Sequence, residues 1–244
     1  MYLLGFAASY FLIRYQINED TTLTAAEKQE EKRHLENLVL VIILGVIVGG
    51  RLGYVIFYNP GYFLEHPGEI FATWHGGMSF HGGVIASIIG GWLYARKAGL
   101  NFWKWADRII VTVPIGLGLG RIGNFINGEL YGRPANVPWA MIFPDGGLVP
   151  RHPSQLYEAL LEGVVLFAIL WSVRKRDWIP GTKLALFLIL YGSFRFFVEF
   201  FRQPDEQLGY ILWSWVTMGQ ILSIFMIIAG FALLIFLKRK SRSG

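Results

Sequence analysis

The 244-residue sequence contains no cysteine. Disulfide bonds, thiolate metal sites and a cysteine nucleophile within this chain are therefore excluded. Charged residues are also scarce, at 16% of the chain, whereas hydrophobic residues make up 54% and the mean hydropathy is +0.44. A soluble domain normally carries about 25% charged residues. This balance favours an integral membrane protein over a large soluble α-helical domain.

Apolar runs close to the length needed to cross a bilayer recur along the chain. They lie near residues 2–13, 38–58, 79–95, 109–126, 155–173, 184–201 and 217–237. We therefore expect an all-α, polytopic membrane protein with about seven transmembrane helices, folded as a single domain over residues 1–244. The first run has only 12 residues, too few to span the hydrocarbon core at about 1.5 Å per residue. We expect the sequence to start inside a truncated first helix.

Lysine and arginine are distributed unevenly between these runs. Sixteen of the 22 lie in four segments, namely 14–36, 96–108, 174–183 and the C-terminal tail, against three in the other connections. The positive-inside rule then predicts an N-terminal end outside and a C-terminus in the cytoplasm. The same bias explains the net charge of +5 as charge that faces anionic lipid, so we expect no nucleic-acid partner.

The connections on the predicted outer side differ in composition from the basic inner ones. Segments 59–80, 127–154 and 202–216 are rich in Gly, Pro, Trp, His, Asn and Asp. We expect these three loops to form the mouth of an outward-facing active site. The sequence has no evident internal repeat of the kind that marks many secondary transporters.

Polar groups gather where the fourth apolar run ends, in the stretch GRIGNFINGELYGRP. Arg121 and Asn124 are three residues apart, so they share one face of a helix, and Asn127, Glu129 and Arg133 follow closely. That face must point into the bundle or a polar cavity, because lipid cannot satisfy it. Polar contacts that merely hold helices together are the alternative, but the number of converging groups favours a ligand site.

Two other apolar runs also carry charges. Arg51 interrupts the second run, where a charge near the bilayer centre costs roughly 3 kcal/mol or more and needs a partner; a structural role and a substrate contact both fit it. In the sixth run Arg195, Glu199 and Arg202 follow at intervals of four and three, on one helix face. A salt bridge between Arg195 and Glu199 would shield both charges from lipid, while Arg202 at the outer end is placed to bind a ligand.

The stretch WHGGMSFHGG enters the third run from the outer side. Histidine is suited to proton transfer near neutral pH, and the flanking glycines allow close approach. We therefore take His81 as the candidate general base, with a buried, hydrogen-bonded histidine as the alternative. His75, His81 and His152 could suggest zinc, but no zinc-ligand spacing accompanies them. We expect neither a metal ion nor another cofactor.

Arginines, amides and one histidine at an outer mouth indicate phosphate chemistry on a lipid. The arginine fork matches phosphate oxygens, and a phosphate at the membrane surface fits a phospholipid headgroup. A histidine base implies a nucleophile that loses a proton, and any thiol nucleophile must arrive on a second substrate. The residues alone predict a phospholipid-using transferase or hydrolase. An anion carrier or channel is the rival from another class, but polar groups are concentrated at one mouth rather than along a pore.

The stretch GRIGNFINGELYGRP resembles the signature of the prolipoprotein diacylglyceryl transferases, bacterial inner-membrane enzymes that start lipoprotein maturation. The stretches GGRLGYVIFYN, GGMSFHGG, PRHPSQLYE and VEFFRQPDEQLG resemble other motifs of that family, in the same order, from about residue 38 to 223. The resemblance implies transfer of the sn-1,2-diacylglyceryl group of phosphatidylglycerol to the lipobox cysteine thiol of a prolipoprotein signal peptide. A thioether forms and glycerol 1-phosphate leaves. It also implies a multi-pass protein of the bacterial cytoplasmic (inner) membrane, with its active site on the outer side.

In that scheme Arg121 and Arg202 match the phosphate-binding arginines of the family, and His81 matches the histidine proposed as base. The full predicted substrate-binding set is Arg121, Asn124, Asn127, Glu129, Gly132, Arg51 and Glu199. Family members usually carry an outer arm and a complete first helix before the position of MYLLGF, including a tyrosine implicated in activity. Here Met1 stands at that point.

Overall fold

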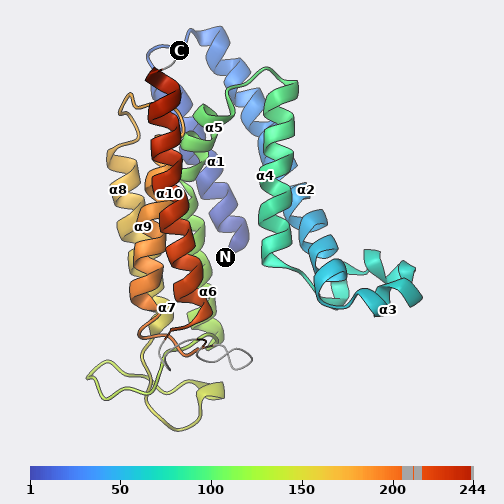
Figure 1. Cartoon of the computed structure of the whole chain (residues 1–244), viewed down its shortest axis with the longest axis vertical. Helices are drawn as coiled ribbons and strands as arrows, with labels where there is room; N and C mark the ends of the chain where they lie inside the picture. Colours follow the sequence, from blue (N-terminus) through green and yellow to red (C-terminus); the bar gives the residue numbers. More distant parts are fainter. Residues whose placement is uncertain (205–210, 212–215, 243–244) are drawn as a thin grey trace. The chain divides into compact units, whose positions relative to one another are not determined.

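The computed structural model describes residues 1–204, 211 and 216–242, and regular structure in these residues is helical (Figure 1). A helix lies over each of the seven predicted runs, which confirms the all-α prediction. The fifth run is composite: α7 (Ser154–Glu158) continues as a π-helix (Ala159–Val165) and then as α8 (Leu166–Ser172). The other long helices are α1 (Tyr2–Glu19), α2 (Ala25–Phe57), α4 (Phe80–Lys97), α5 (Phe102–Ile110), α6 (Val113–Asn127), α9 (Thr182–Val198) and α10 (Met218–Arg242).

Four helical stretches among the described residues are long and apolar enough to cross a membrane. They are Ala25–Phe57, Phe102–Asn127, Ser154–Ser172 and Met218–Arg242. Their length and composition agree with an integral membrane protein. The count of seven spanning helices and their orientation stay predictions.

The charged connection predicted over 14–36 is mostly helical. Helix α1 continues past the apolar run to Glu19, and α2 already begins at Ala25. Thr24 and Glu27 form a capping box: the Glu27 amide donates to Thr24 Oγ1 over 3.3 Å, and the Thr24 amide donates to Glu27 Oε2 over 2.7 Å. Because Ala, Glu, Gln and Lys are good helix formers, this cap starts α2 well before its apolar part. Hydrophobic runs therefore underestimate the length of both helices.

The chain divides into two compact units, each described here by itself. The large unit comprises Met1–Ile13 and Ala106–Gly244, and the small unit comprises Arg14–Trp105. The prediction of a single domain stays a prediction.

Helices α9 and α10 pack against each other in the large unit. A Cβ atom on Gly192 would lie 2.8 Å from the carbonyl oxygen of Ser223, and one on Gly230 would lie 2.9 Å from that of Ala185. Small residues at these positions allow the two backbones to approach closely. At the start of α9, the Asp107 carboxylate accepts hydrogen bonds from the amides of Gly181 and Leu184, at 2.9 and 2.8 Å. This carboxylate satisfies helix-terminal donors that have no partner inside the helix.

In the small unit, α2 and α4 run side by side (Figure 1). A Cβ atom on Gly45 would lie 2.8 Å from the Ser87 Cα atom, and one on Gly53 would lie 2.9 Å from the Gly82 Cα atom. These contacts show why α2 carries glycine at every fourth position, since a larger side chain would separate the helices.

The contact between α6 and the π-helix is equally close. A Cβ atom on Gly163 would lie 2.8 Å from the Gly118 Cα atom, and one on Gly118 would lie 3.0 Å from the Gly163 Cα atom. Both partners are backbone atoms, so neither helix can yield locally. Short π-helical insertions are rare and often occur at functional sites. Here the insertion brings Glu162 and the preceding Glu158 to the face that α6 presents with Arg121.

Gly163→Ala should therefore lower stability. Overpacking of this kind typically costs about 1–3 kcal/mol, which corresponds to a fall of several degrees in the thermal unfolding midpoint measured in detergent. Gly120→Ala is the matched control, because a Cβ atom there meets nothing within 4 Å and alanine favours the helix. Equal midpoints for the two variants would contradict a tight contact between α6 and the π-helix.

Candidate active site

Six charged side chains meet inside the large unit. They are Arg121 on α6, Glu158 at the end of α7, Glu162 in the π-helix, Arg195 on α9, and Glu199 and Arg202 just after α9. The side chains of Glu158 and Glu162 are fully buried and that of Glu199 is 3% exposed. We call this set the charged cluster.

Glu158 lies at the centre of the charged cluster. Its Oε2 atom is 2.9 Å from Arg121 Nε, and its Oε1 atom accepts a hydrogen bond from Arg195 Nη1. The Nε atom of Arg202 lies 3.9 Å from the same Oε1 atom. One carboxylate thus contacts all three arginines, each from a different part of the sequence.

The other two glutamates complete the charge balance. Glu199 Oε2 lies 2.9 Å from Arg195 Nη2, and Glu199 Oε1 accepts a hydrogen bond from the Thr217 hydroxyl over 2.9 Å. Glu162, one turn beyond Glu158, lies 3.9 Å from Arg121 Nε and 3.8 Å from Arg195 Nη1. With all six groups ionised, the formal charge of the charged cluster is zero. Such balance is required where an unpaired buried charge would be strongly destabilising.

Arg121 is the arginine of this group that is most open to a ligand. Its side chain is 21% exposed, compared with 12% for Arg195 and 11% for Arg202. Both of its ion pairs are made through Nε, and within the described residues no hydrogen bond occupies its two Nη atoms. The two Nη atoms carry four of the five N–H groups of the guanidinium, a planar group that binds carboxylates and phosphates in two-point contacts.

The signature stretch folds around the Glu129 side chain. Its Oε1 atom accepts hydrogen bonds from the side-chain amides of Asn124 and Asn127, at 2.8 and 3.3 Å. The side-chain amide of Gln155 donates to the backbone carbonyl oxygen of Glu129 over 2.7 Å. Gly128 ends α6 in a left-handed conformation, with φ of 72°, which glycine adopts readily. The structure thus brings together three of the predicted site residues; their role in substrate binding stays a prediction.

Gly132 is needed for close backbone approach. Its amide donates to the His152 carbonyl oxygen over 2.9 Å, and a Cβ atom on it would lie 2.6 Å from the Phe201 carbonyl oxygen. A residue with any side chain would push these segments apart. Arg133 ties the same region together, since its Nε donates to the Arg202 carbonyl oxygen and its Nη2 to that of Glu199, at 2.9 and 3.1 Å. Arg133 therefore satisfies carbonyl groups at the end of α9.

Known proteins resemble this chain over almost its whole length. The model of the family described as prolipoprotein diacylglyceryl transferase matches residues 1–236. The chain belongs to the prolipoprotein diacylglyceryl transferase family. A protein of Desulfotalea psychrophila named phosphatidylglycerol–prolipoprotein diacylglyceryl transferase is 57% identical over 239 residues, which cover 96% of this chain and 85% of that protein. Relatives of the same name from Bordetella avium and Pseudomonas aeruginosa are 51% and 48% identical and cover 99% and 98% of this chain, and 89% and 88% of their own length.

Two site residues predicted for this member of the prolipoprotein diacylglyceryl transferase family lie in the small unit. His81 is exposed in the first turn of α4, two residues after the N-cap Ser79. Arg51 on α2 is 6% exposed, and its guanidinium donates to backbone carbonyl groups. The remaining predicted residues belong to the large unit, where Arg121, Glu199 and Arg202 share the charged cluster. Direct substrate contacts by Arg51 and Glu199 stay predictions.

Sequence reasoning missed Glu158 and Glu162. Both lie in the fifth apolar run, in the stretch SQLYEALLEGVV, four residues apart. Two acids on one face of a membrane-embedded helix are as costly as the arginines that attracted notice. A search for buried acids that could balance those arginines would have found them. Among the described residues, no group of three His, Asp or Glu side chains is arranged to hold a metal ion.

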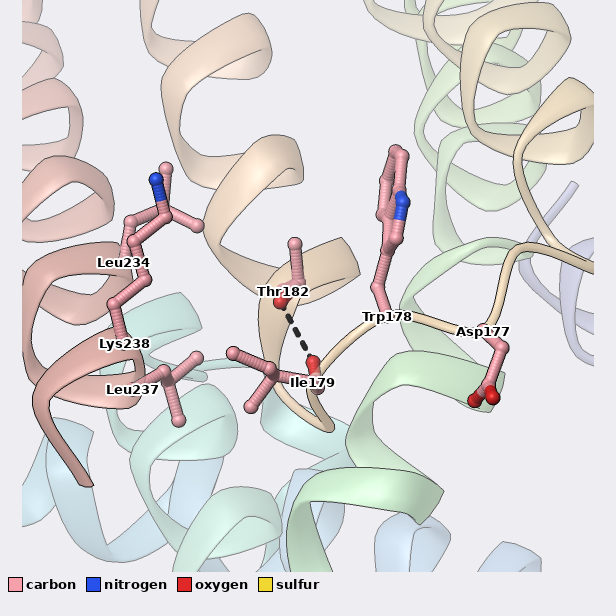
Figure 2. Close-up of a pocket in the computed structure, with 7 residues that line it drawn as sticks. All are labelled: Asp177, Trp178, Ile179, Thr182, Leu234, Leu237 and Lys238. Atoms are coloured by element: carbon pink, nitrogen blue, oxygen red, sulfur yellow. Dashed lines mark hydrogen bonds between the residues drawn. The ribbon is translucent and has the colours of Figure 1, made fainter. Parts of the chain in front are cut away.

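Two further features concern the surroundings of the charged cluster, namely the predicted mouth segment and a pocket. Of the predicted mouth segment 202–216, residues 205–210 and 212–215 are outside the described residues. A pocket of about 340 Å³ lies at the opposite end of α9, between Trp178 and Ile179 before that helix and Leu234 and Leu237 on α10 (Figure 2). Its Thr182 hydroxyl donates to the Ile179 carbonyl oxygen over 2.6 Å. It contains none of the residues of the charged cluster.

An aromatic group beside the charged cluster includes His152. The Trp139 indole donates to the Tyr157 hydroxyl over 2.7 Å, and that hydroxyl lies 3.1 Å from His152 Nδ1. Since Tyr157 already accepts from Trp139, its own proton is available for Nδ1 only when that nitrogen is unprotonated. Partial burial also lowers the pKa of His152. Both effects favour the neutral imidazole in the folded protein.

The sign of the resulting pH dependence follows from linkage. An unfolded histidine titrates near pH 6.5, so His152 contributes its full stability above that pH and progressively less as the pH falls towards its lower folded pKa. We expect the protection factor of the Gly132 amide, which is the ratio of its intrinsic to its observed exchange rate, to fall as the pH is lowered from 7.5 to 5.5. This fall should be smaller in His152→Gln. His66→Gln, at an exposed histidine, is the control. A fall in the protection factor that is the same in all three proteins would rule out His152 as its source.

Proposed function

We propose that this protein transfers the diacylglyceryl group of phosphatidylglycerol to the cysteine thiol of a prolipoprotein lipobox. The observation that carries the proposal is the charged cluster, where Arg121 presents Nη atoms that no described residue hydrogen-bonds, beside a buried set of ion pairs. Membership of the family and relatives that bear this name support the substrates. The strong basic bias of the predicted inner segments supports an outward-facing site in a bacterial cytoplasmic membrane.

The chemistry is a displacement at carbon. The thiol sulfur forms a bond to the glyceryl carbon that carries the phosphate ester, and the C–O bond at that carbon breaks. Its electron pair stays with the phosphate oxygen, so glycerol 1-phosphate leaves with all of its P–O bonds intact. The thiol proton goes to a base, for which we propose His81. Negative charge grows on the departing phosphate, and arginines that stabilise this charge more strongly than that of the bound diester accelerate the reaction.

The charge balance of the large unit suggests how the phosphate is received. With all six groups ionised the charged cluster carries no net charge, so an anionic phosphate must compete with a carboxylate for an arginine. Arg121 is the natural point of exchange, because it is the most exposed of the three and its ion pairs with described residues are made through Nε. Arg202, 3.9 and 4.0 Å from its two glutamate partners, is the second proposed phosphate ligand. Glu158 and Glu162 position both Arg121 and Arg195.

The acceptor thiol separates a transferase from a hydrolase. Purified protein is incubated with headgroup-labelled phosphatidylglycerol and a lipobox peptide that carries either cysteine or serine. We expect release of glycerol phosphate and formation of a thioether with the cysteine peptide only. Release at the same rate with the serine peptide would favour hydrolysis by water.

Arg121→Ala should abolish transfer while the protein still inserts into the membrane. Arg121→Lys should also be poor, losing about 10-fold or more in kcat/KM, because an ammonium group cannot make the two-point contact with phosphate. The measurement is thioether formation per amount of detergent-purified protein. Arg33→Ala is the control, since the Arg33 side chain is 68% exposed and pairs only with its helical neighbour Glu30 among the described residues. Near wild-type turnover in Arg121→Ala would end its assignment as phosphate ligand.

A further inference from the structure

Among the described residues, every hydrogen bond from the Arg51 guanidinium goes to a backbone carbonyl group of one loop, residues 69–77. Its Nε donates to one oxygen at 2.9 Å, Nη1 donates to two at 2.6 and 3.1 Å, and Nη2 donates to two at 2.6 and 3.1 Å. In that order the accepting residues are Ile70, Gly76, Gly77, Glu69 and Ala72. The ring of Phe63 lies 5.1 Å from the guanidinium carbon.

This geometry accounts for the full donor capacity of the side chain. A guanidinium has five N–H groups, one on Nε and two on each Nη, and the five contacts match that distribution. A phosphate could bind Arg51 only by displacing carbonyl groups from it, and the buried one, that of Ala72, would then be left without a partner. The contacts therefore favour a role in shaping the loop over direct contact with a substrate.

The loop that Arg51 holds leads directly to His81. Gly76 and Gly77 both have left-handed backbones, with φ of 82° and 76°, and Arg51 Nη1 binds both of their carbonyl groups. Two residues on, the Ser79 amide donates to the carbonyl oxygen of Gly50, the neighbour of Arg51, over 2.8 Å. The Ser79 hydroxyl then caps α4 by accepting from the Gly82 amide over 3.2 Å.

Close helix packing fixes the other side of the same turn. A Cβ atom on Gly53 would lie 2.9 Å from the Gly82 Cα atom and 3.1 Å from the Ser79 Cβ atom. The start of α4 thus packs closely against α2 two residues beyond Arg51. His81 stands between two fixed points, Ser79 and Gly82, and its ring lies edge-on to that of its neighbour Phe80. Its direction depends on the backbone that carries it.

We propose that Arg51 is a positioning residue, which holds the turn before α4 and thereby directs His81 in the transfer reaction. This inference rests on the proposed function, in which His81 accepts the thiol proton. Loss of the clamp should then reduce the chemical step and leave lipid binding intact. A misplacement of about 1 Å at a catalytic group can lower the rate by about 100-fold.

The test is a double-mutant cycle with thioether formation as the readout. Arg51→Lys keeps the charge but supplies three donors in place of five. We expect it to lower kcat by about 10-fold or more with KM for phosphatidylglycerol nearly unchanged. His81→Gln should lose about 100-fold, the usual scale of general-base catalysis. In the His81→Gln background, Arg51→Lys should cause almost no further loss, because the two residues act through one group.

Two controls make the cycle decisive. Arg96→Lys changes an arginine of the last turn of α4, which lies over the Trp92 ring, and should have no effect on kcat. Amide hydrogen exchange at Gly82 should accelerate in Arg51→Lys but not in Arg96→Lys. This readout needs no turnover, so it still tests the clamp if the wild-type protein forms no thioether and the proposed function fails.

Three results would overturn the inference. A raised KM together with full additivity in the cycle would make Arg51 a substrate ligand. Lower protein yield with unchanged specific activity would restrict Arg51 to folding. Unchanged exchange at Gly82 in Arg51→Lys would show that Arg51 does not hold the turn.

Discussion

The large unit depends on one constraint: charges buried among apolar helices must be paired where they lie. Glu158 and Glu162 have no exposure at all, so three arginines from other parts of the chain must reach them. That requirement explains the close contact of Gly118 with Gly163 and the π-helix at the same place, which bring the acids and Arg121 within 2.9–3.9 Å. It also explains why Glu199 receives a hydroxyl from Thr217 besides Arg195. The close spacing of α6 and the π-helix and the ion pairs between them therefore depend on each other.

A balanced set of buried charges serves catalysis better than isolated arginines would. Arginines held by buried glutamates keep their direction before the substrate arrives, so little reorganisation is needed when charge develops on a leaving phosphate. In the proposed mechanism the same glutamates limit how strongly the site holds an anion, because a phosphate must compete with them. In the proposed reaction the leaving group gains negative charge relative to the bound diester. A site that binds the diester only moderately therefore reserves its strongest interaction for the transition state.

Different parts of the structure were accessible from the sequence to different degrees. Composition and apolar runs indicated the helices, and glycine at every fourth position of α2, at Gly45, Gly49 and Gly53, is a pattern typical of closely packed membrane helices. Helix ends were missed where polar helix formers continue an apolar run, as at Ala25. The partners of Arg121 were missed because they come from a helix some 40 residues later, and its π-helical turn has no signal in hydrophobic periodicity. Partners distant in the sequence become visible only when every buried charge is required to have one.

Arg51 and Arg121 show why residue type and hydrophobic context cannot separate structure from function. Each interrupts an apolar run beside glycines, but the sequence left a structural charge and a ligand both open for Arg51 and favoured a ligand for Arg121. The difference lies in the donors. Arg51 donates all five N–H groups to the carbonyl oxygens of a loop 18 to 26 residues away. Arg121 makes its ion pairs through Nε, and no described residue hydrogen-bonds its Nη atoms. A guanidinium with unoccupied donors beside a charge-balanced site is available for binding. A saturated one is available only to hold what surrounds it, which for Arg51 is the turn that carries His81.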